Sequence, residues 1–195
     1  IEKIVVSQVD DKMNFIEGTE KEFEVDTLLL SVGLLPSNVL LEDMGMEMSS
    51  TRGPVVNEMM ETSVEGIFAC GNSLHVHDLV DFVTKEGRAA GKGASKYLNN
   101  LVSRSNEVLE CKPGNGLGYL IPQSVNVSNV DDRVEFKFRV RRPMENKKIV
   151  VKINDNQIKK VVKPHLLPAE METIVIKKEE FTSNAGNLVI EVEDM

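Results

Sequence analysis

The chain has 195 residues, of which 41% are hydrophobic and 28% are charged, so it can form one or two globular domains with a real core. Its formal net charge of -8 at pH 7 argues against nucleic acid or an anionic membrane surface as the main partner. No apolar run approaches the roughly 20 residues that a membrane-spanning helix needs, so no membrane span is expected. The sequence begins Ile1-Glu2-Lys3, without an initiator Met or a signal peptide, which favours a fragment or a processed product.

Two cysteines, Cys70 and Cys111, lie far apart and form no C-x-x-C pattern. This spacing argues against a zinc knuckle or a redox-active cysteine pair within these residues. Cys70 ends an apolar stretch, so we expect it to be a small buried hydrophobic residue. Sparse, unpaired cysteines fit a reducing, cytoplasmic compartment.

Three short runs occupy the beginning of the chain. Residues 1–9, Lys12–Glu17 and Phe23–Val32 predict a meander of three antiparallel strands, with turns at Asp10-Asp11 and at residues 18–21. The third run is almost continuously apolar and stops at Gly33. Such a run is typical of a strand buried on both faces of a parallel sheet.

A second apolar run, Ile67–Cys70, stops in the same way at Gly71. In parallel sheets, ligands lie beyond the carboxyl ends of the strands, where glycine permits a close approach of the backbone. Between the two runs, Ser37 or Asn38 is placed to cap a short helix that continues to Asp43 and stops at Gly45, and residues 53–57 predict a brief strand.

Apolar residues from Val76 to Val102 recur near a 3.6-residue period and predict one long helix. Gly87, Gly91 and Gly93 interrupt this helix, and each costs about 1 kcal/mol relative to Ala. They indicate a close approach of another element or a cofactor to the helix. A break in the helix near Gly87 is the alternative.

Residues 103–118 contain turn formers without a periodic pattern and predict a linker. Short strands rich in Val and Ile follow, separated by turn clusters, and their spacing predicts a small antiparallel β-sandwich of immunoglobulin-like or fibronectin-III-like size. These predicted strands are Ser124–Val130, Arg133–Val140, Lys148–Ile153, Ile158–Val162, Glu172–Lys177 and Asn187–Val192.

The two stretches that end in glycine also carry a resemblance. The patterns T-x-h-h-h-h-G-x-x-P, from Thr27 to Pro36, and T-S-x-x-G-I-F-A-x-G-N, from Thr62 to Asn72, resemble the two C-terminal signatures of the pyridine nucleotide-disulfide oxidoreductase family. These are two-domain FAD/NAD(P) flavoproteins, similar to thioredoxin reductase. The resemblance covers residues 1–102 and only the last part of the family's fold.

The resemblance implies an α/β region followed by an all-β region, that is, a partial Rossmann-like FAD-binding domain followed by the β-sandwich. We expect residues 1–24 to be the end of the NAD(P) domain with its crossover strands, and residues 25–104 to be the C-terminal part of the FAD-binding domain. The linker then covers residues 105–118, and the sandwich covers residues 119–195.

The resemblance also implies which residues bind the cofactor: Gly33, Pro36, Gly71, Asn72, Asp81, Phe82 and Val83. Gly71-Asn72 would lie at the ribityl chain and pyrophosphate of the flavin, and the first turn of the following helix would face the flavin pyrimidine. The family usually has Asp in place of Asn72 and Gln-Ala in place of Asp81-Phe82, so these positions depart from its pattern. A turn Asn with positive φ is the alternative interpretation of Asn72.

His75 and His77, next to Asp78, form an unusual local cluster with three open interpretations. It could be a polar loop that enters a helix, a proton donor near the flavin, or a metal site. We expect no metal, because side chains two residues apart on a helix face different directions.

The family's fingerprint for binding the dinucleotide pyrophosphate, G-x-G-x-x-G, is absent from the sequence. We therefore expect a C-terminal fragment of an FAD-dependent NAD(P)H oxidoreductase that supplies the ribityl and isoalloxazine side of the flavin site. FAD and NAD(P) belong to the intact protein, and the fragment is expected to be inactive by itself, with no tightly bound cofactor.

Unpaired strand edges predict a homo-oligomer, and the intact enzyme would pass electrons to a protein acceptor or a partner subunit. The alternative is a non-enzymatic module whose β-sandwich binds a partner protein.

Overall fold

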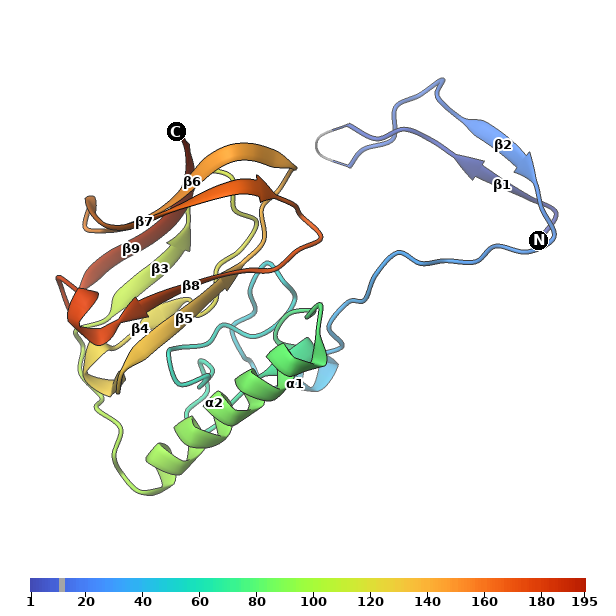
Figure 1. Ribbon diagram of the computed structural model, residues 1–195. Helices are drawn as coiled ribbons and strands as arrows, with labels where there is room; N and C mark the ends of the chain where they lie inside the picture. The colour runs from blue at the N-terminus through green and yellow to red at the C-terminus, as the bar shows by residue number, and fades with distance from the viewer. Residues whose placement is uncertain (11–12) are drawn as a thin grey trace. The chain divides into compact units, whose positions relative to one another are not determined.

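The computed structural model describes residues 1–10 and 13–195, which form two compact units, Ile1–Leu34 and Leu35–Met195 (Figure 1). None of the helices among these residues is long and apolar enough to cross a membrane.

The first unit is a β-hairpin, in which β1 (Lys3–Val6) pairs antiparallel with β2 (Lys21–Glu24). The predicted three-stranded meander is wrong, because the middle run contributes one bridge, between Val9 and Phe15, and no strand among the described residues. The hydroxyl of Thr19 explains this local structure: it donates to the carbonyl of Ile16 and accepts from the Gln8 amide, which ties the loop across its base. Parts of the predicted turn at 10–11 and of the run 12–17 lie outside the described residues.

The apolar stretch after β2 is irregular. Residues 27–38 pair with no strand of the described chain, and the side chains of Leu29 and Val32 are 90% and 84% exposed. The predicted strand from Phe23 to Val32 is therefore present only at its beginning, in β2. A continuous apolar run forms a strand only where neighbouring strands cover it.

The second unit begins with a short helix and three isolated bridges. Helix α1 (Val39–Asp43) follows Asn38 as predicted, but the Asn38 side chain donates to the carbonyls of Arg52 and Ser73, at 2.8 and 2.6 Å, and does not cap the helix. The run Ile67–Cys70 forms a single antiparallel bridge, Glu61 to Phe68, so the prediction of a buried parallel strand there is wrong. The other bridges are Met48 to Pro54 and Val56 to Thr62.

Helix α2 (Val80–Leu98) is shorter than the predicted helix and runs unbroken through Gly87. Its buried face consists of Glu86, Ala90 and Gly93, which are four and three residues apart and so share one side of a helix. A Cβ on Gly93 would lie 2.3 Å from the carbonyl oxygen of Met59, whereas a Cβ on Gly87 or on Gly91 would meet nothing within 4 Å. The close approach predicted from the glycines therefore exists at Gly93.

Two sheets form the rest of the unit. The first sheet has the strand order β4-β3-β9-β6-β7, and the second consists of β5 and β8. Their bounds are β3 (Leu109–Pro113), β4 (Ser124–Val125), β5 (Arg133–Phe138), β6 (Met144–Ile153), β7 (Asn156–Leu166), β8 (Glu172–Lys177) and β9 (Gly186–Asp194).

Five of the six predicted strands of this region are confirmed, whereas Ser124–Val130 is a strand only in β4 and continues as a 3-10 helix, η2 (Val127–Asn129). The predicted linker, in contrast, contains β3, which runs parallel to β9. The sheet is thus not purely antiparallel. Leu109 and Cys111 point into the core between the exposed residues Glu110 and Lys112, so β3 has the alternation of a strand.

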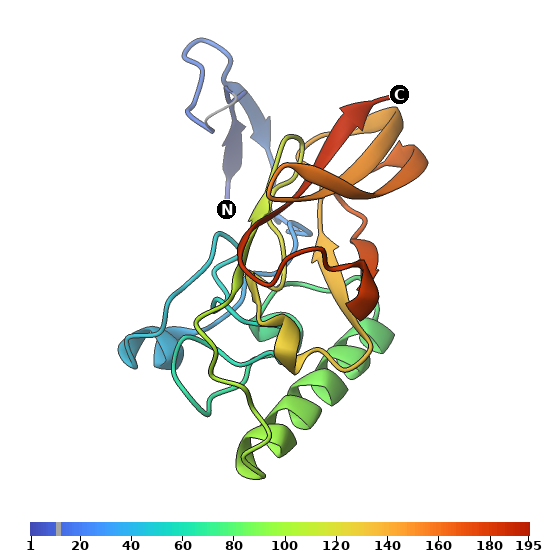
Figure 2. The same cartoon turned by 90° about the vertical axis from the view of Figure 1, so that its left-hand side faces the viewer.

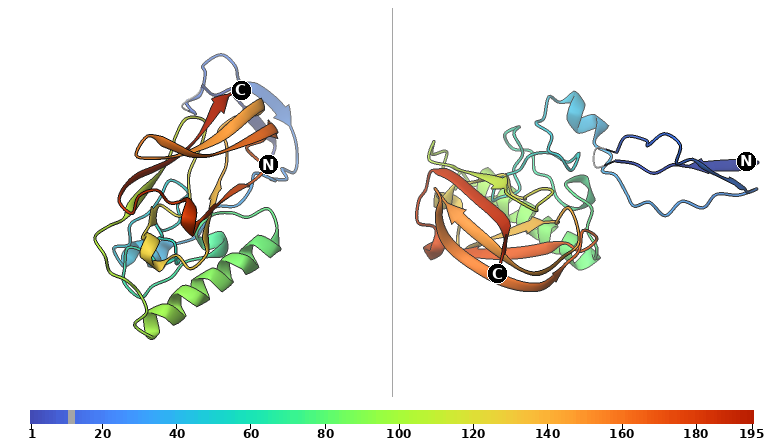
Figure 3. Two further views of the ribbon diagram at one scale, coloured as in Figure 1. Left: turned by 60° about the vertical axis from the view of Figure 1, so that its left-hand side comes forward. Right: turned by 90° about the horizontal axis from the view of Figure 1, so that it is seen from above.

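The core of this region lies between the two sheets. Phe136 and Phe138 of β5 are fully buried together with Ile149 of β6 and with Leu188 and Ile190 of β9. The β6–β7 hairpin lies at the end of the unit far from α2 (Figure 3), and α2 runs beside β5 and η2 (Figure 2). This arrangement brings side chains from β5 to the buried face of α2.

Candidate functional site

Gly71 begins a 3-10 turn, η1 (Gly71–Ser73), with a φ of +68°, in the left-handed region that favours glycine. The residue is buried, and a Cβ placed on it would lie 3.2 Å from Cγ1 of Val83 in α2. Its carbonyl oxygen accepts hydrogen bonds from the amides of Leu74 and His75, at 2.9 and 3.2 Å. Gly71 is thus required by its backbone conformation and by its contact with the beginning of α2.

Asn72 fixes the loop that leads into α2. Its Oδ1 atom accepts a hydrogen bond of 3.1 Å from the amide of His77. The left-handed φ belongs to Gly71 and not to Asn72, so the interpretation of Asn72 as a turn residue with positive φ is wrong. Its side chain is otherwise exposed.

The N-terminus of α2 carries no side-chain cap, because Leu79 stands at the capping position. Asp81 is exposed in the first turn, and the half-buried Phe82 has the ammonium of Lys85 5.6 Å from its ring centroid. The structure thus brings Gly71 close to Val83, and Asp81 and Phe82 directly precede Val83 at the start of α2.

Gly33 and Pro36 lie outside the regular secondary structure. Both lie in the irregular stretch before α1, Gly33 with a φ of +88° and exposed, Pro36 half-buried. The approach of Gly33 to Gly71 stays a prediction.

A buried carboxylate lies directly behind the Gly71 turn. The Glu86 side chain is fully buried and accepts four hydrogen bonds. Oε2 accepts from the amide of Gly71 at 2.6 Å and from Nε2 of His77 at 2.9 Å. Oε1 accepts from Nε2 of His75 at 3.1 Å and from Nζ of Lys137 at 2.6 Å. Since a carboxylate offers about four lone-pair sites, Glu86 is saturated.

The charges of this cluster follow from its contacts. Burial by itself raises the pKa of Glu86, but hydrogen bonds from His75 and His77 and the charge of Lys137 outweigh burial and lower that pKa well below its usual range. Burial lowers the pKa of His75, which favours the neutral ring. With Nε2 donating to Glu86, the Nδ1 atom of His75 accepts from the hydroxyl of Tyr119 at 3.2 Å.

His75, His77 and Glu86 could in principle hold a metal ion, since one ligand atom from each lies within 4.8 Å of the others. However, the ammonium of Lys137 already neutralises the carboxylate, and every lone-pair site of Glu86 is used. The three side chains therefore form a hydrogen-bonded cluster around an ion pair. Nδ1 of His77 is buried and has no hydrogen-bond partner among the described residues.

The helix argument about the two histidines is wrong. His75 and His77 lie in the loop that enters α2 and not on the helix, so their two-residue spacing does not separate them, and both rings point at Glu86. Both side chains are buried in this loop. Glu86, Lys137 and Tyr119 are not predicted from the sequence. A signal existed for Glu86, which shares its helical face with Ala90 and Gly93.

A second ion pair holds the same loop to the C-terminal region. The guanidinium of Arg139 donates to the carboxylate of Asp78 and, at 3.1 Å, to the carbonyl of Val76. Asp78 also accepts from the amide of Met171 at 2.8 Å. Burial raises the pKa of Asp78, but the hydrogen bond from Arg139 outweighs it, so the pKa is lowered.

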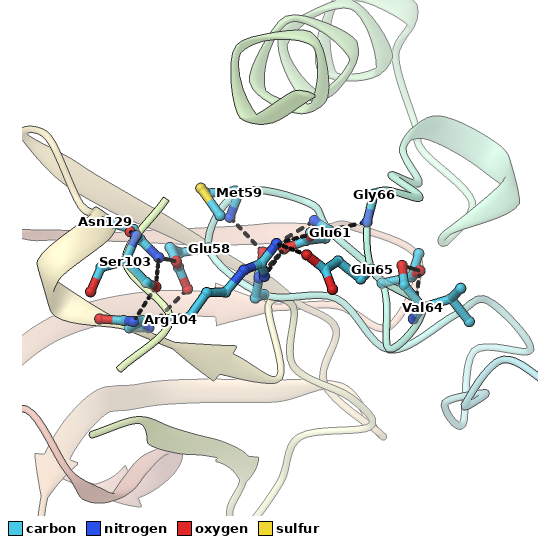
Figure 4. Close-up of polar contacts among 12 residues, drawn as sticks. Glu58, Met59, Glu61, Val64, Glu65, Gly66, Ser103, Arg104 and Asn129 are labelled. Atoms are coloured by element: carbon cyan, nitrogen blue, oxygen red, sulfur yellow. Dashed lines mark hydrogen bonds and ion pairs between the residues drawn. The ribbon is translucent and has the colours of Figure 1, made fainter. Parts of the chain in front are cut away.

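A separate acidic cluster lies near the end of α2 (Figure 4). Arg104 binds both carboxylate oxygens of Glu61, at 2.8 and 3.0 Å, and Glu61 also accepts from the amide of Gly66. Glu58 accepts from the Asn126 amide and the Asn129 side chain, and burial raises its pKa. These carboxylates are satisfied by protein donors, so the cluster ties chain segments together.

Part of the chain is similar to known proteins. The pyridine nucleotide-disulphide oxidoreductase family matches residues 2–87. The small chain of glutamate synthase [NADPH] from two Mycobacterium tuberculosis strains is 32% identical over 95 residues, which are 48% of this chain and 20% of the relative. Thioredoxin reductase of Bacillus subtilis is 33% identical over 89 residues, which are 44% of this chain and 27% of the relative.

The ferredoxin–NADP reductase of Limosilactobacillus fermentum is 36% identical over 56 residues, 28% of this chain and 17% of the relative. The chain thus spans at most 27% of the length of these relatives. No solved structure gives a match. The resemblance inferred from the two glycine motifs is confirmed, and the matched residues include the Gly71 turn and the first two turns of α2.

Proposed function

We propose that this pyridine nucleotide-disulfide oxidoreductase-like chain supplies the ribityl and isoalloxazine side of the flavin site in an FAD-dependent NAD(P)H oxidoreductase. The observation that carries the proposal is the Gly71 turn. A left-handed glycine packs against Val83 at the start of a 19-residue helix, and both residues lie within the part of the chain that matches the family.

The residues around this turn fit a flavin. Asn72 uses one lone pair on the His77 amide and keeps its NH₂ group and a second lone pair for a ribityl hydroxyl. The uncapped first turn of α2 offers backbone N–H groups to an electron-rich ring. Asp81 already places a negative charge at this helix end, so the turn favours an anionic flavin less than a neutral first turn would. When bound, FAD would accept a hydride from the nicotinamide and pass electrons on.

FAD binding by these residues alone is expected to be weak, because the chain lacks the G-x-G-x-x-G loop that holds the pyrophosphate. The test is a titration of the ¹⁵N-labelled chain with FAD. We expect saturable shifts at the amides of Gly71, Asn72 and Val83, and no flavin retained after desalting. Shifts that spare these three amides, or no shifts at all, would overturn the proposal. Flavin retained in a 1:1 ratio would show that other residues of this chain hold the pyrophosphate.

A matched pair of variants sharpens the test. Asn72→Asp keeps an acceptor for the His77 amide and restores the acid that the family usually has, so its FAD-induced shifts at Gly71 should persist. Asn72→Ala removes the acceptor, so the FAD-induced shifts at the Gly71 amide should be several-fold smaller. Equal responses of the two variants would show that Asn72 does not contact the flavin.

The remaining expectations are part of the same proposal. The two C-terminal sheets around one core are proposed as an immunoglobulin- or fibronectin-III-like β-sandwich, with domain limits at residues 24, 104 and 118.

We also propose a cytoplasmic homo-oligomer that delivers electrons to a protein acceptor. Its contact is the exposed apolar stretch that contains Leu29 and Val32, because such bare segments recruit other chains. Light scattering that reports a monomer would contradict the oligomer.

A further inference from the structure

We infer that Lys137, on a strand outside the family-matched residues, is a positioning residue for the Gly71 turn and acts on it through Glu86. The flavin-binding role of that turn rests on the function proposed above. The positioning itself can be measured without any flavin.

The connection consists of two short hydrogen bonds that share one carboxylate. Nζ of Lys137 lies 2.6 Å from Oε1 of Glu86, and Oε2 of Glu86 lies 2.6 Å from the amide nitrogen of Gly71. Lys137 and Glu86 are 6% and 1% exposed, so the connection is inside the protein. Lys137 is itself held firmly, because its backbone exchanges hydrogen bonds of 2.8 and 3.0 Å with Ile121.

The charge of Lys137 explains why the carboxylate stays at the Gly71 amide. A buried carboxylate is costly unless a cation and hydrogen bonds compensate it. Burial favours neutral His75, so Lys137 supplies a full positive charge that this ring does not. Without Lys137, Glu86 would move toward solvent or take up a proton. Either response weakens the charge-assisted bond to Gly71.

The C-terminal sheets are consequently part of the site and not an independent appendage. Two more residues of the C-terminal region, which lie outside its strands, reach the same loop: the Tyr119 hydroxyl contacts His75, and the Arg139 guanidinium contacts Asp78. Lys137 stands apart from these two because it reaches the one side chain that binds the Gly71 amide. This provides a defined route from β5 to the glycine turn.

The experiment measures hydrogen exchange of the Gly71 amide in the whole chain and compares Lys137→Met with Lys147→Met. The control lysine lies on β6, pairs with Asp194 near the surface, and does not contact the α2 face. We expect exchange at Gly71 to accelerate about tenfold or more in K137M and to stay unchanged in K147M.

A second background distinguishes positioning from simple packing. Glu86→Gln removes the buried charge, so adding K137M to E86Q should change Gly71 exchange less than twofold. An equal acceleration in both backgrounds, or unchanged exchange in K137M, would overturn the inference. If K137M does not fold, folding of the double variant supports the inference, and failure of both overturns it. The proposed function fails separately, through absent FAD shifts at Gly71 in the wild type.

Discussion

Replacing Gly87 or Gly91 of α2 by alanine should stabilise the protein, whereas the same replacement at Gly93 should destabilise it. At Gly87 and Gly91 a new Cβ would meet nothing within 4 Å. At Gly93 it would lie 2.3 Å from the Met59 carbonyl oxygen and 3.1 Å from a ring carbon of Phe68. The three sites therefore separate helix propensity from packing within one helix.

The size of each effect follows from these contacts. Alanine in a helix interior is favoured over glycine by about 1 kcal/mol, so G87A and G91A should each stabilise the protein by roughly that amount. In G93A the backbone oxygen of Met59 cannot rotate away, and α2 must move by roughly 1 Å. Overpacking of this kind costs about 1 to 3 kcal/mol, so after subtracting the helix-propensity gain of about 1 kcal/mol we expect a net loss of up to about 2 kcal/mol.

Thermal unfolding followed by circular dichroism measures the difference. For a domain of roughly 150 to 250 residues, 1 kcal/mol shifts Tm by about 2 to 4 °C. G87A and G91A should therefore raise Tm by about that much, while G93A lowers it by up to about 8 °C. If G93A raises Tm as the other two variants do, α2 does not pack closely on the Met59 segment, and the account of its buried face is wrong.

Three further predictions concern side chains. Burial lowers the pKa of His75, so the unfolded state takes up the proton first, and the protein should lose stability as the pH falls below about 6.5. Urea midpoints measured between about pH 7.5 and pH 5 should show this loss, and His75→Gln should make it smaller. An unchanged dependence of the midpoint on pH in His75→Gln would contradict the prediction. Arg104→Lys loses the two parallel N–H donors that bind the two oxygens of Glu61 and should cost about 1 kcal/mol in the same assay, so a wild-type midpoint would argue against the bidentate pair. Burial raises the pKa of Cys111, which is 4% exposed, so a thiol reagent should modify the half-buried Cys70 first; mass spectrometry that finds Cys111 labelled first would refute this order.

The strands of the C-terminal region could be predicted because their pattern is local. Val134, Phe136 and Phe138 alternate with charged residues, and the predicted limits of Glu172–Lys177 agree with β8. Strand β3 was missed although Leu109 and Cys111 also alternate with charges, because Pro113 and the glycines after it suggested a turn region. Its partner, β9, is far away in the sequence, and nothing local announces such a parallel pairing.

The N-terminal apolar run shows the opposite error. The side chains of Leu28 to Val32 favour a strand, but periodicity does not say whether a neighbouring strand exists, and the described chain provides none. The site shows the same dependence on long-range contacts. Gly71 was predicted from a motif. Lys137 could not be predicted in this way, because it lies 51 residues from Glu86 in the sequence and reaches it only through the packing of β5 against α2.

The position of β9 in the middle of its sheet, between β3 and β6, has a consequence for synthesis. A ribosome delivers residues in order, so β3 and β6 leave the exit tunnel long before the strand that joins them. Until Gly186–Asp194 emerges, the edges of β3 and β6 that pair with β9 are open to chaperones or to aggregation. A premature stop codon shortly before Gly186 would therefore remove the central strand of the sheet. Loss of these few residues should destabilise the region as much as a much longer truncation would.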